Sequence, residues 1–235
     1  MHLRPSAELA ERVLLPGDPH RALAVAQDLL EAPKMFNHSR GLWGYTGVAP
    51  DGDLLTVQAT GMGGPSAAIV CEELISLGAR RLLRIGTCGA LVPGLHHGEL
   101  LAAETVVPED GVSAAMGARG PLGADPAMTA ALVDAGARPA TVVSTDLFYD
   151  PRADVAREWI ELGAVAVEME AAAVLRVAGR RGVPAACVLV VTDVPAAGGA
   201  ERMDGAGLAA LGPLLGRVGY AGFRTRRRSG APAGG

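Results

Sequence analysis

The chain has 235 residues, of which 49% are hydrophobic, and its formal net charge is −4 at pH 7. This length and apolar content suit one large domain with a buried core. The negative charge excludes a general electrostatic attraction to nucleic acids, and no apolar run reaches the ~18 residues that a membrane-spanning helix needs.

Short β-rich runs alternate with helical patterns along the chain. In chain order, the sequence predicts a strand at 12–15, a helix at 19–30, a strand at 54–59, a helix at 65–77, strands at 81–85 and 100–107, a helix at 126–135, a strand at 141–144, helices at 153–162 and 171–181, and a strand at 185–191. Several of these helices begin at proline, and glycines follow three of them. The alternation predicts an α/β fold: a single domain of three layers, α/β/α, with helices on both faces of a central mixed, twisted sheet.

Two segments depart from this alternation. Residues 108–125 are polar and glycine-rich, and we predict a surface loop or lid there. Residues 205–222 contain several glycines and Pro213. We expect the domain to span residues 1–222 and the basic tail, 223–235, to be disordered.

The three cysteines lie in apolar segments without the spacing of metal ligands: Cys71, Cys88 and Cys187. We interpret them as reduced thiols in the core and predict no metal site. The N-terminus has no basic stretch followed by an apolar core. A cytoplasmic location is therefore expected.

Ligands of such sheets bind beyond the carboxyl ends of the strands, so the loops that follow the predicted strands are the candidate binding segments. After the strand at 12–15, a glycine turn leads into a helix whose first turn carries Arg21, an arrangement that favours phosphate. The alternative is an ordinary turn with Asp18 at the helix cap. The strand at 81–85 contains Arg84, whose burial requires either a bound anion or an internal carboxylate.

Residues 164–174 form an apolar run that contains only two charged side chains, Glu168 and Glu170. Burying a carboxylate is costly unless a partner donates hydrogen bonds to it. If residues 165–170 are extended, both carboxylates point to one face and Met169 to the other, which makes a two-acceptor clamp suited to a sugar diol. The alternative is that one glutamate is only the first-turn acid of the helix at 171–181.

Six ordered segments carry a resemblance to a known family: 13–22, 40–47, 61–74, 84–90, 146–149 and 167–172. Together they resemble the bacterial high-molecular-weight, hexameric purine nucleoside phosphorylases, of the nucleoside phosphorylase/uridine phosphorylase superfamily. The resemblance implies a phosphorylase-type fold and phosphorolysis of purine (deoxy)ribonucleosides, with inorganic phosphate as co-substrate and no cofactor. It also implies a cytoplasmic homohexamer whose active site is shared across a dimer interface, with no nucleic acid or membrane partner.

The resemblance assigns roles to individual residues. Phosphate is bound by Gly17, Arg21, Arg84 and Thr87, with Arg40 reaching in from a neighbouring subunit. The residues implied to bind the nucleoside are His2, Met62, Cys88, Phe148, Val167, Glu168, Met169, Glu170 and Thr192. Asp193 is the implied general acid toward the leaving base, assisted by Arg202.

Several alternatives remain open. The arginines at 21, 40 and 84 favour phosphate over water as nucleophile, and the uracil-binding Gln-x-Arg pair of uridine phosphorylases does not follow Tyr149. Segments 60–73 and 83–90 nevertheless look like uridine phosphorylase. The alternatives are therefore a uridine phosphorylase, a methylthioadenosine phosphorylase or nucleosidase, and a non-catalytic nucleoside-binding relative. A glycosidase that uses Glu168 and Glu170 is disfavoured, because residues two apart lie too close for an inverting pair.

Overall fold

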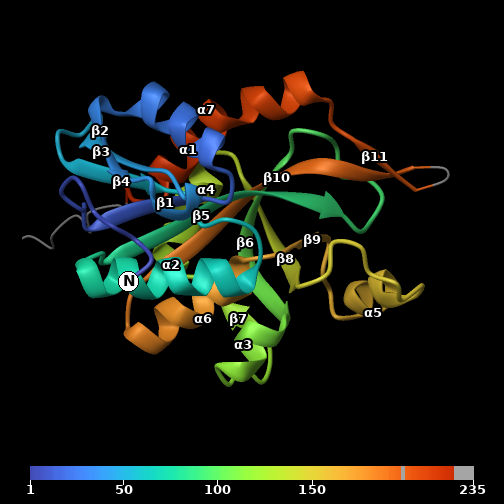
Figure 1. The fold of residues 1–235 in the computed structure, drawn as a ribbon. Helices are drawn as coiled ribbons and strands as arrows, with labels where there is room; N and C mark the ends of the chain where they lie inside the picture. The colour runs from blue at the N-terminus through green and yellow to red at the C-terminus, as the bar shows by residue number, and fades with distance from the viewer. Residues whose placement is uncertain (197–198, 225–235) are drawn as a thin grey trace, which may run out of the picture.

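The computed structural model describes residues 1–196 and 199–224, which form one mixed sheet covered by helices on both faces (Figure 1). The strands are β1 Arg12–Pro16, β2 Glu31–Asn37, β3 Gly44–Val48, β4 Leu54–Gln58, β5 Arg81–Ala90, β6 Leu100–Glu109, β7 Leu122–Gly123, β8 Arg138–Thr145, β9 Ala166–Glu168, β10 Ala185–Ala196 and β11 Gly199–Arg202. The helices are α1 Pro19–Leu29, α2 Gly64–Leu77, α3 Gly111–Ala115, α4 Pro126–Asp134, α5 Val155–Glu161, α6 Ala171–Arg181 and α7 Gly205–Ala221, and Ser39–Gly41 forms a 3₁₀ turn.

The sheet has the order β11-β10-β6-β8-β9-β5-β1-β4-β3-β2, with β7 beside β6. β5 is parallel to β1 and β10 but antiparallel to β9, so the predicted mixed sheet is confirmed. Because β10 pairs with both β5 and β6, the strands β5, β9, β8, β6 and β10 form a closed ring. β5 pairs with β10 from Leu82 to Gly89 and with β9 at Gly89 and Ala90. Side chains of β5 and β9, which are far apart in the sequence, are therefore close to each other in this ring.

Two apolar clusters lie on opposite faces of the sheet. One lies between the sheet and the helices α2 and α6, and the other lies between the sheet and α1, α4 and α7. The side chains of β1 alternate between them, with Leu14 on the second and its two neighbours on the first. This is the predicted three-layer α/β/α architecture, and Figure 1 shows α1 and α7 above the sheet and α2 and α6 below it.

Two helices, α1 and α4, begin directly after an aspartate that caps them. Asp18 precedes α1 and its carboxylate accepts a hydrogen bond from the backbone N–H of Arg21 at 2.7 Å, while Pro19 occupies the first turn. Asp125 caps α4 in the same way, through the N–H of Met128. The expected turn with Asp18 at the cap is thus present, and it fixes Arg21 on the first turn of α1.

The antiparallel pair β2 and β3 was not predicted. The first five residues of β2 are exposed and include Pro33 and Lys34, so this edge strand shows no apolar alternation. The predicted loop at 108–125 is also wrong, since it contains α3 and β7. α3 has five residues and β7 has two, and both are too short to show a hydrophobic period in the sequence.

Helix α7 occupies the segment whose glycines and Pro213 gave no helical prediction. Three of its glycines are buried, Gly212, Gly216 and Gly219, and a side-chain carbon built at Gly216 would lie 2.7 Å from Cγ1 of Val25. One built at Gly219 would lie 2.5 Å from Cγ2 of Ile85. Glycine therefore lets this helix approach α1 and the sheet closely, and tertiary packing outweighs the low helix propensity.

The domain extends slightly further than predicted. Phe223, which we placed in the tail, is 4% exposed and belongs to the core cluster under α7. Its carbonyl accepts a hydrogen bond from Arg81. The predicted disordered tail otherwise falls on residues 225–235, which lie outside the described residues, as do its Arg226, Arg227 and Arg228.

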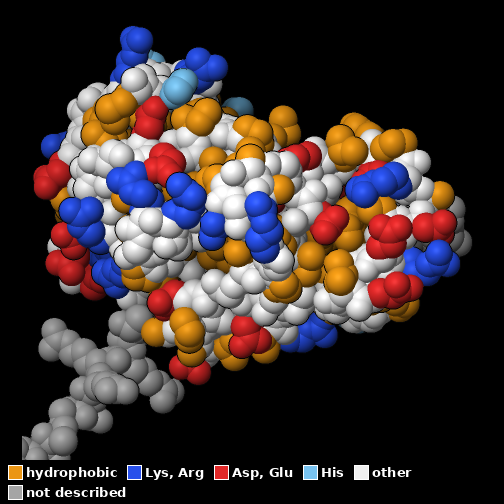
Figure 2. Space-filling view, turned by 90° about the horizontal axis from the view of Figure 1, so that it is seen from below, with side chains coloured by type: hydrophobic (Ala, Val, Ile, Leu, Met, Phe, Trp, Pro, Cys, Tyr) orange, Lys and Arg blue, Asp and Glu red, His pale blue; other side chains and the backbone are white. Residues whose placement is uncertain are grey.

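The face that carries α2, α3 and α6 shows positive, negative and apolar side chains interspersed, with no continuous area of one charge (Figure 2). Of the helices described in residues 1–196 and 199–224, none combines the length and hydropathy needed to cross a bilayer.

Candidate active site

A cavity of about 620 Å³ opens where the loops after β1, β4, β5 and β8 meet the β9–α6 junction and the end of β10. This is the carboxyl edge at which the sequence predicted a site. All but two of the predicted site residues line it: Gly17, Arg21, Met62, Arg84, Thr87, Cys88, Phe148, Val167, Glu168, Met169, Glu170, Thr192, Asp193 and Arg202. His2 and Arg40 do not.

The loops after β1 and β4 are joined by backbone hydrogen bonds. The N–H of Thr60 donates to the carbonyl of Pro16 at 2.9 Å, and that of Gly61 donates to Gly17 at 3.0 Å. Arg21 follows this pair of loops on α1. Burial lowers the pKa of Arg21, and the nearby positive charge of Arg84 lowers it further, while Asp18 and Glu170 oppose the change. Two guanidinium groups close enough to repel each other favour an anion between them.

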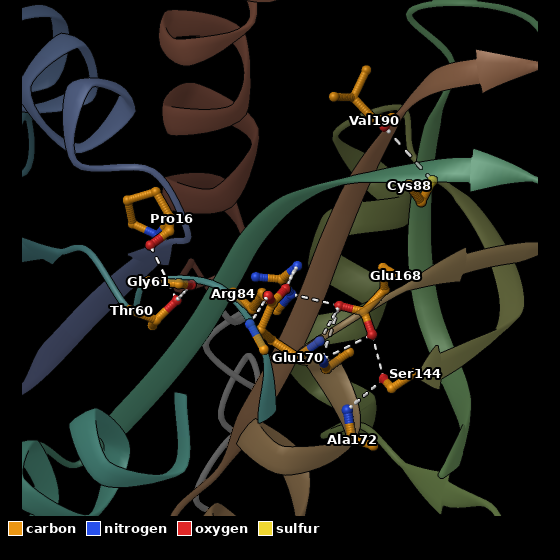
Figure 3. A network of polar contacts seen from close by, with 12 residues as sticks. Pro16, Thr60, Gly61, Arg84, Cys88, Ser144, Glu168, Glu170, Ala172 and Val190 are labelled. Atoms are coloured by element: carbon orange, nitrogen blue, oxygen red, sulfur yellow. Dashed lines mark hydrogen bonds and ion pairs between the residues drawn. The ribbon is translucent and has the colours of Figure 1, made fainter. Parts of the chain in front are cut away.

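Arg84 lies on β5, is 3% exposed, and binds both glutamates of the apolar run (Figure 3). Its Nε donates to Oε2 of Glu168 at 2.8 Å, and its Nη2 lies 2.5 Å from Oε2 of Glu170. Gly86 makes room for this guanidinium, because a side-chain carbon there would lie 2.7 Å from Nη2. Although burial disfavours the charged form, the two carboxylates hold the pKa of Arg84 above its usual range.

One arm of Arg84 remains available. Its Nη1 is buried and has no hydrogen-bond partner within the described part of the chain. The internal carboxylates that were one of the two alternatives for Arg84 are therefore present and use its Nε and Nη2, whereas Nη1 is the part of the guanidinium that they leave unused.

Glu168 and Glu170 reach the same guanidinium. The expected extended run at 165–170 is only partly present, because β9 ends at Glu168 and Glu170 stands at the N-cap of α6. Oε1 of Glu170 accepts the N–H of Gly63 at 2.5 Å, which ties the loop after β4 to this pair. Burial raises the pKa of Glu170, and Arg84 opposes that change. Since both carboxylates are held by one cation, the structure does not support their use as the acid and nucleophile of a glycosidase.

Glu168 differs from Glu170 in having no free acceptor site. Its oxygens accept hydrogen bonds from Arg84, the hydroxyl of Ser144 and the backbone N–H groups of Glu170 and Ala171. A carboxylate offers about four lone-pair positions, and these donors occupy them. Glu168 lines the cavity, but its contacts make it a support for Arg84 and not a ligand for a base.

Asp193 lies in β10 at the other part of the cavity. Its Oδ1 is 3.0 Å from Nε of Arg202, which stands directly across on β11, and its Oδ2 accepts the hydroxyl of Thr192 at 2.9 Å. The Arg202 guanidinium also lies over the ring of Phe148, 5.0 Å from its centroid. Asp193, its cation and an aromatic ring thus form one group beside the cavity.

Cys88 faces the cavity but is not a nucleophile. Burial raises the pKa of its thiol, which therefore stays protonated at pH 7. The cysteines of the chain are free and buried, as predicted. Within residues 1–196 and 199–224, no cluster of His, Cys, Asp or Glu side chains is arranged to hold a metal ion.

Some residues of the site were missed. Ser144, Thr145, Asp150 and Trp159 either line the cavity or support a residue that does. Ser144 and Thr145 end an otherwise apolar buried strand, and a polar side chain in such a strand was the available signal. Asp150 and Trp159 carried no local signal.

A second, smaller cavity of about 250 Å³ holds the two remaining predicted residues. It is lined by Met1, His2, Arg4, Ser39 and Arg40, and it shares no residue with the larger cavity.

Buried contacts organise this second group. Asn37, 0% exposed, accepts the N–H of Arg4 at 2.9 Å and donates to the carbonyls of Ser39 and Leu42, while Glu73 binds the ring of His2 at 2.8 Å. Arg40 itself has φ 60°, a left-handed conformation that is uncommon for a residue with a side chain.

The fold and the cavity define an α/β protein with two buried or half-buried arginines at one end of its site and a carboxylate paired with an arginine at the other. A sequence profile of the Phosphorylase superfamily matches residues 11–209, and the chain belongs to this family. It is 38% identical over 199 residues to a purine nucleoside phosphorylase DeoD-type of Caldanaerobacter subterraneus subsp. tengcongensis, covering 79% of this chain and 84% of that relative. A protein of the same name from Alkaliphilus metalliredigens is 36% identical, over 82% of this chain and 86% of that relative. Another from Geobacillus kaustophilus is also 36% identical, over 80% of this chain and 83% of that relative.

Proposed function

We propose that the protein is a purine nucleoside phosphorylase, which cleaves the N-glycosidic bond of purine (deoxy)ribonucleosides with inorganic phosphate and releases the free base and (deoxy)ribose 1-phosphate. The observation that carries this proposal is the separation of two groups within one cavity. β10 places Cys187 opposite Arg84 and Asp193 opposite Gly89. Five residues along β5 correspond to roughly 16 Å between backbone positions. The Arg84 guanidinium reaches along the strand to Gly86, which leaves three residues, roughly 10 Å, between it and the position opposite Asp193, so the two groups occupy different parts of the cavity.

β9 and the turn that leads from it into α6 run between these two parts of the cavity. Val167 pairs with Gly89 near Asp193, whereas Glu170 contacts Arg84. A nucleoside lying along β9 would therefore place its base near Val167, Phe148, Cys88 and Thr192, and its ribose near Met62, Met169 and Glu170. Phosphate would then bind Gly17, Arg21, Arg84 and Thr87. The order base, ribose, phosphate along the cavity is the order that phosphorolysis requires.

The chemistry follows from this placement. A phosphate oxygen bonds to the anomeric carbon as the bond from that carbon to the base nitrogen breaks, through a ribosyl state of cationic character. Glu170 stabilises that positive charge. Asp193, protonated when the nucleoside binds, donates its proton to N7 of the leaving purine, and Arg202 pairs with the carboxylate that this transfer leaves. Glu168 keeps Arg84 in place and does not contact the base.

The phosphate end is incomplete in one protomer. Its two arginines, Arg21 and Arg84, are balanced by Glu168 and Glu170, so these four groups carry no net charge to attract a phosphate dianion. We propose that Arg40 of a neighbouring subunit supplies the missing cation and that the neighbour's His2 covers the 5′ end. This requires a homo-oligomer, which we propose to be a hexamer built from dimers. The free buried thiols fit the reducing cytoplasm, where we place the protein, and no cofactor takes part.

The proposed reaction is tested by measuring base release from inosine, adenosine and uridine, each with and without phosphate. We expect purine release that requires phosphate and little release of uracil. Phosphate-dependent uracil release would make the protein a uridine phosphorylase, and release without phosphate would make it a nucleosidase. No release from any of the three would contradict the proposal.

Shared active sites predict complementation between two inactive variants. Arg40→Ala and Asp193→Asn are each expected to be impaired alone. After the two proteins are unfolded together and reassembled, a site with Asp193 from one protomer and Arg40 from the other is intact, so activity should return. Recovery is measured as phosphate-dependent inosine cleavage. Arg157→Ala, a change at an exposed arginine of α5, controls for activity lost during unfolding and reassembly. The absence of recovery, or an active monomer in sedimentation, would contradict the shared site.

A further inference from the structure

Ser144 lies at the centre of a buried hydrogen-bond network and has no direct contact with the cavity. It is 0% exposed, ends the apolar part of β8, and pairs in register with Glu168 on β9. It does not line the cavity, whereas the next residue, Thr145, does. The proposed function gives it no role.

The hydrogen bonds around Ser144 fix the direction of its hydroxyl. The backbone N–H of Ala172 donates to its Oγ at 2.9 Å, which occupies an acceptor position of the oxygen. Its own proton is directed to Oε1 of Glu168 (Figure 3). Ser144 thereby links the first turn of α6 to the carboxylate that binds Arg84.

Glu168 connects Ser144 to Arg84, because it accepts hydrogen bonds from both. Oε1 of Glu168 accepts the hydroxyl of Ser144 and the N–H of Ala171, and Oε2 accepts Nε of Arg84 at 2.8 Å together with the N–H groups of Glu170 and Ala171. A carboxylate held at one oxygen presents the other in a fixed direction, and the planar guanidinium follows that direction. The orientation of Nη1, the arm without an internal partner in the described residues, is set in the same way.

We propose that Ser144 is a positioning residue for the phosphate site, which acts through Glu168 to orient the guanidinium of Arg84. It touches neither phosphate nor nucleoside. This inference rests on the proposed function, because it takes the ligand of Arg84 to be phosphate. It predicts an effect on phosphate that is separate from any effect on the nucleoside.

The test compares Ser144→Ala with Ser144→Thr, which keeps the hydroxyl, and with Ser113→Ala. Ser113 is also 0% exposed, but its hydroxyl has no partner in the described residues, so it controls for loss of a buried serine oxygen. S144A is expected to raise the KM for phosphate about tenfold, the loss expected for a hydrogen bond to a charged group, and to leave the KM for inosine within about twofold. S144T and S113A should stay near the wild-type values.

Binding of inorganic phosphate alone gives a second readout, measured as the rise in Tm with phosphate concentration in the absence of nucleoside. A wild-type protein that releases base without phosphate would defeat the proposed function. The inference itself is overturned if S144A keeps the wild-type response to phosphate, if both KM values rise equally, or if S144T behaves like S144A. Should S144A fail to fold, Ser144→Cys carries the comparison, since a thiol is similar in size and a weaker donor.

Discussion

Asp193→Asn is expected to lower kcat for inosine about 10²- to 10³-fold while the KM for phosphate changes little. The proposed role of Asp193 is to give a proton to the leaving base, and a positioned acid contributes typically 10²–10⁴-fold to such a step. An amide of the same shape cannot give that proton. The KM for phosphate is expected to stay near the wild-type value, because Asp193 pairs with Gly89, three residues or roughly 10 Å along β5 from Gly86, where the Arg84 guanidinium lies.

Steady-state kinetics with inosine and phosphate varied independently measure both quantities. Asp204→Asn is the matched control, because it makes the same substitution two residues beyond Arg202. Asp204 caps α7 by accepting the N–H of Gly207, a role that asparagine also fills. Turnover of D193N near the wild-type rate, or a loss equal to that of D204N, would remove Asp193 as the acid.

Much of the architecture could be predicted because the buried elements are long. β5, β6 and β10 each contain an apolar run that is recognisable alone, and α2 and α6 have proline or glycine at their boundaries. The elements that were missed are short, exposed or glycine-rich. α7 is the clearest case, because its glycines reflect close packing on Val25 and Ile85, and contacts of that kind are not visible in the local sequence.

The site was predictable to the extent that its chemistry is local. The segments 16–21, 60–66 and 84–90 were recognisable from their glycines, and the first and third also from Arg21 and Arg84, while the two glutamates were recognisable in an apolar run. The partnerships within the site were not predictable. Arg84 and Glu168 are 84 residues apart and Ser144 and Glu168 are 24 apart, and only the ring of strands brings them together.

Arg84→Met is expected to abolish phosphate-dependent turnover and also to lower the free energy of unfolding at neutral pH by about 3–5 kcal/mol. The reason is that Glu168 and Glu170, 5% and 6% exposed, would lose their shared cation and remain as uncompensated buried charges. Urea unfolding at a fixed protein concentration measures the change. Arg181→Met is the contrasting control, because its ion pair with Glu72 is about one-third exposed and such pairs contribute only about 0–1 kcal/mol.

The pH dependence separates this explanation from simple loss of packing. Burial already raises the pKa of Glu170, and Arg84 is the largest influence that opposes the rise, so without Arg84 the folded-state pKa rises further above the unfolded value. A group with a raised folded-state pKa gives stability below its unfolded pKa and loses it as pH rises through the folded one. The deficit of R84M should therefore be larger at pH 8 than at pH 5. Adding E168Q and E170Q to R84M should restore stability without restoring turnover. A deficit that does not vary with pH, or that persists in the triple variant, would show that the buried charges are not its cause.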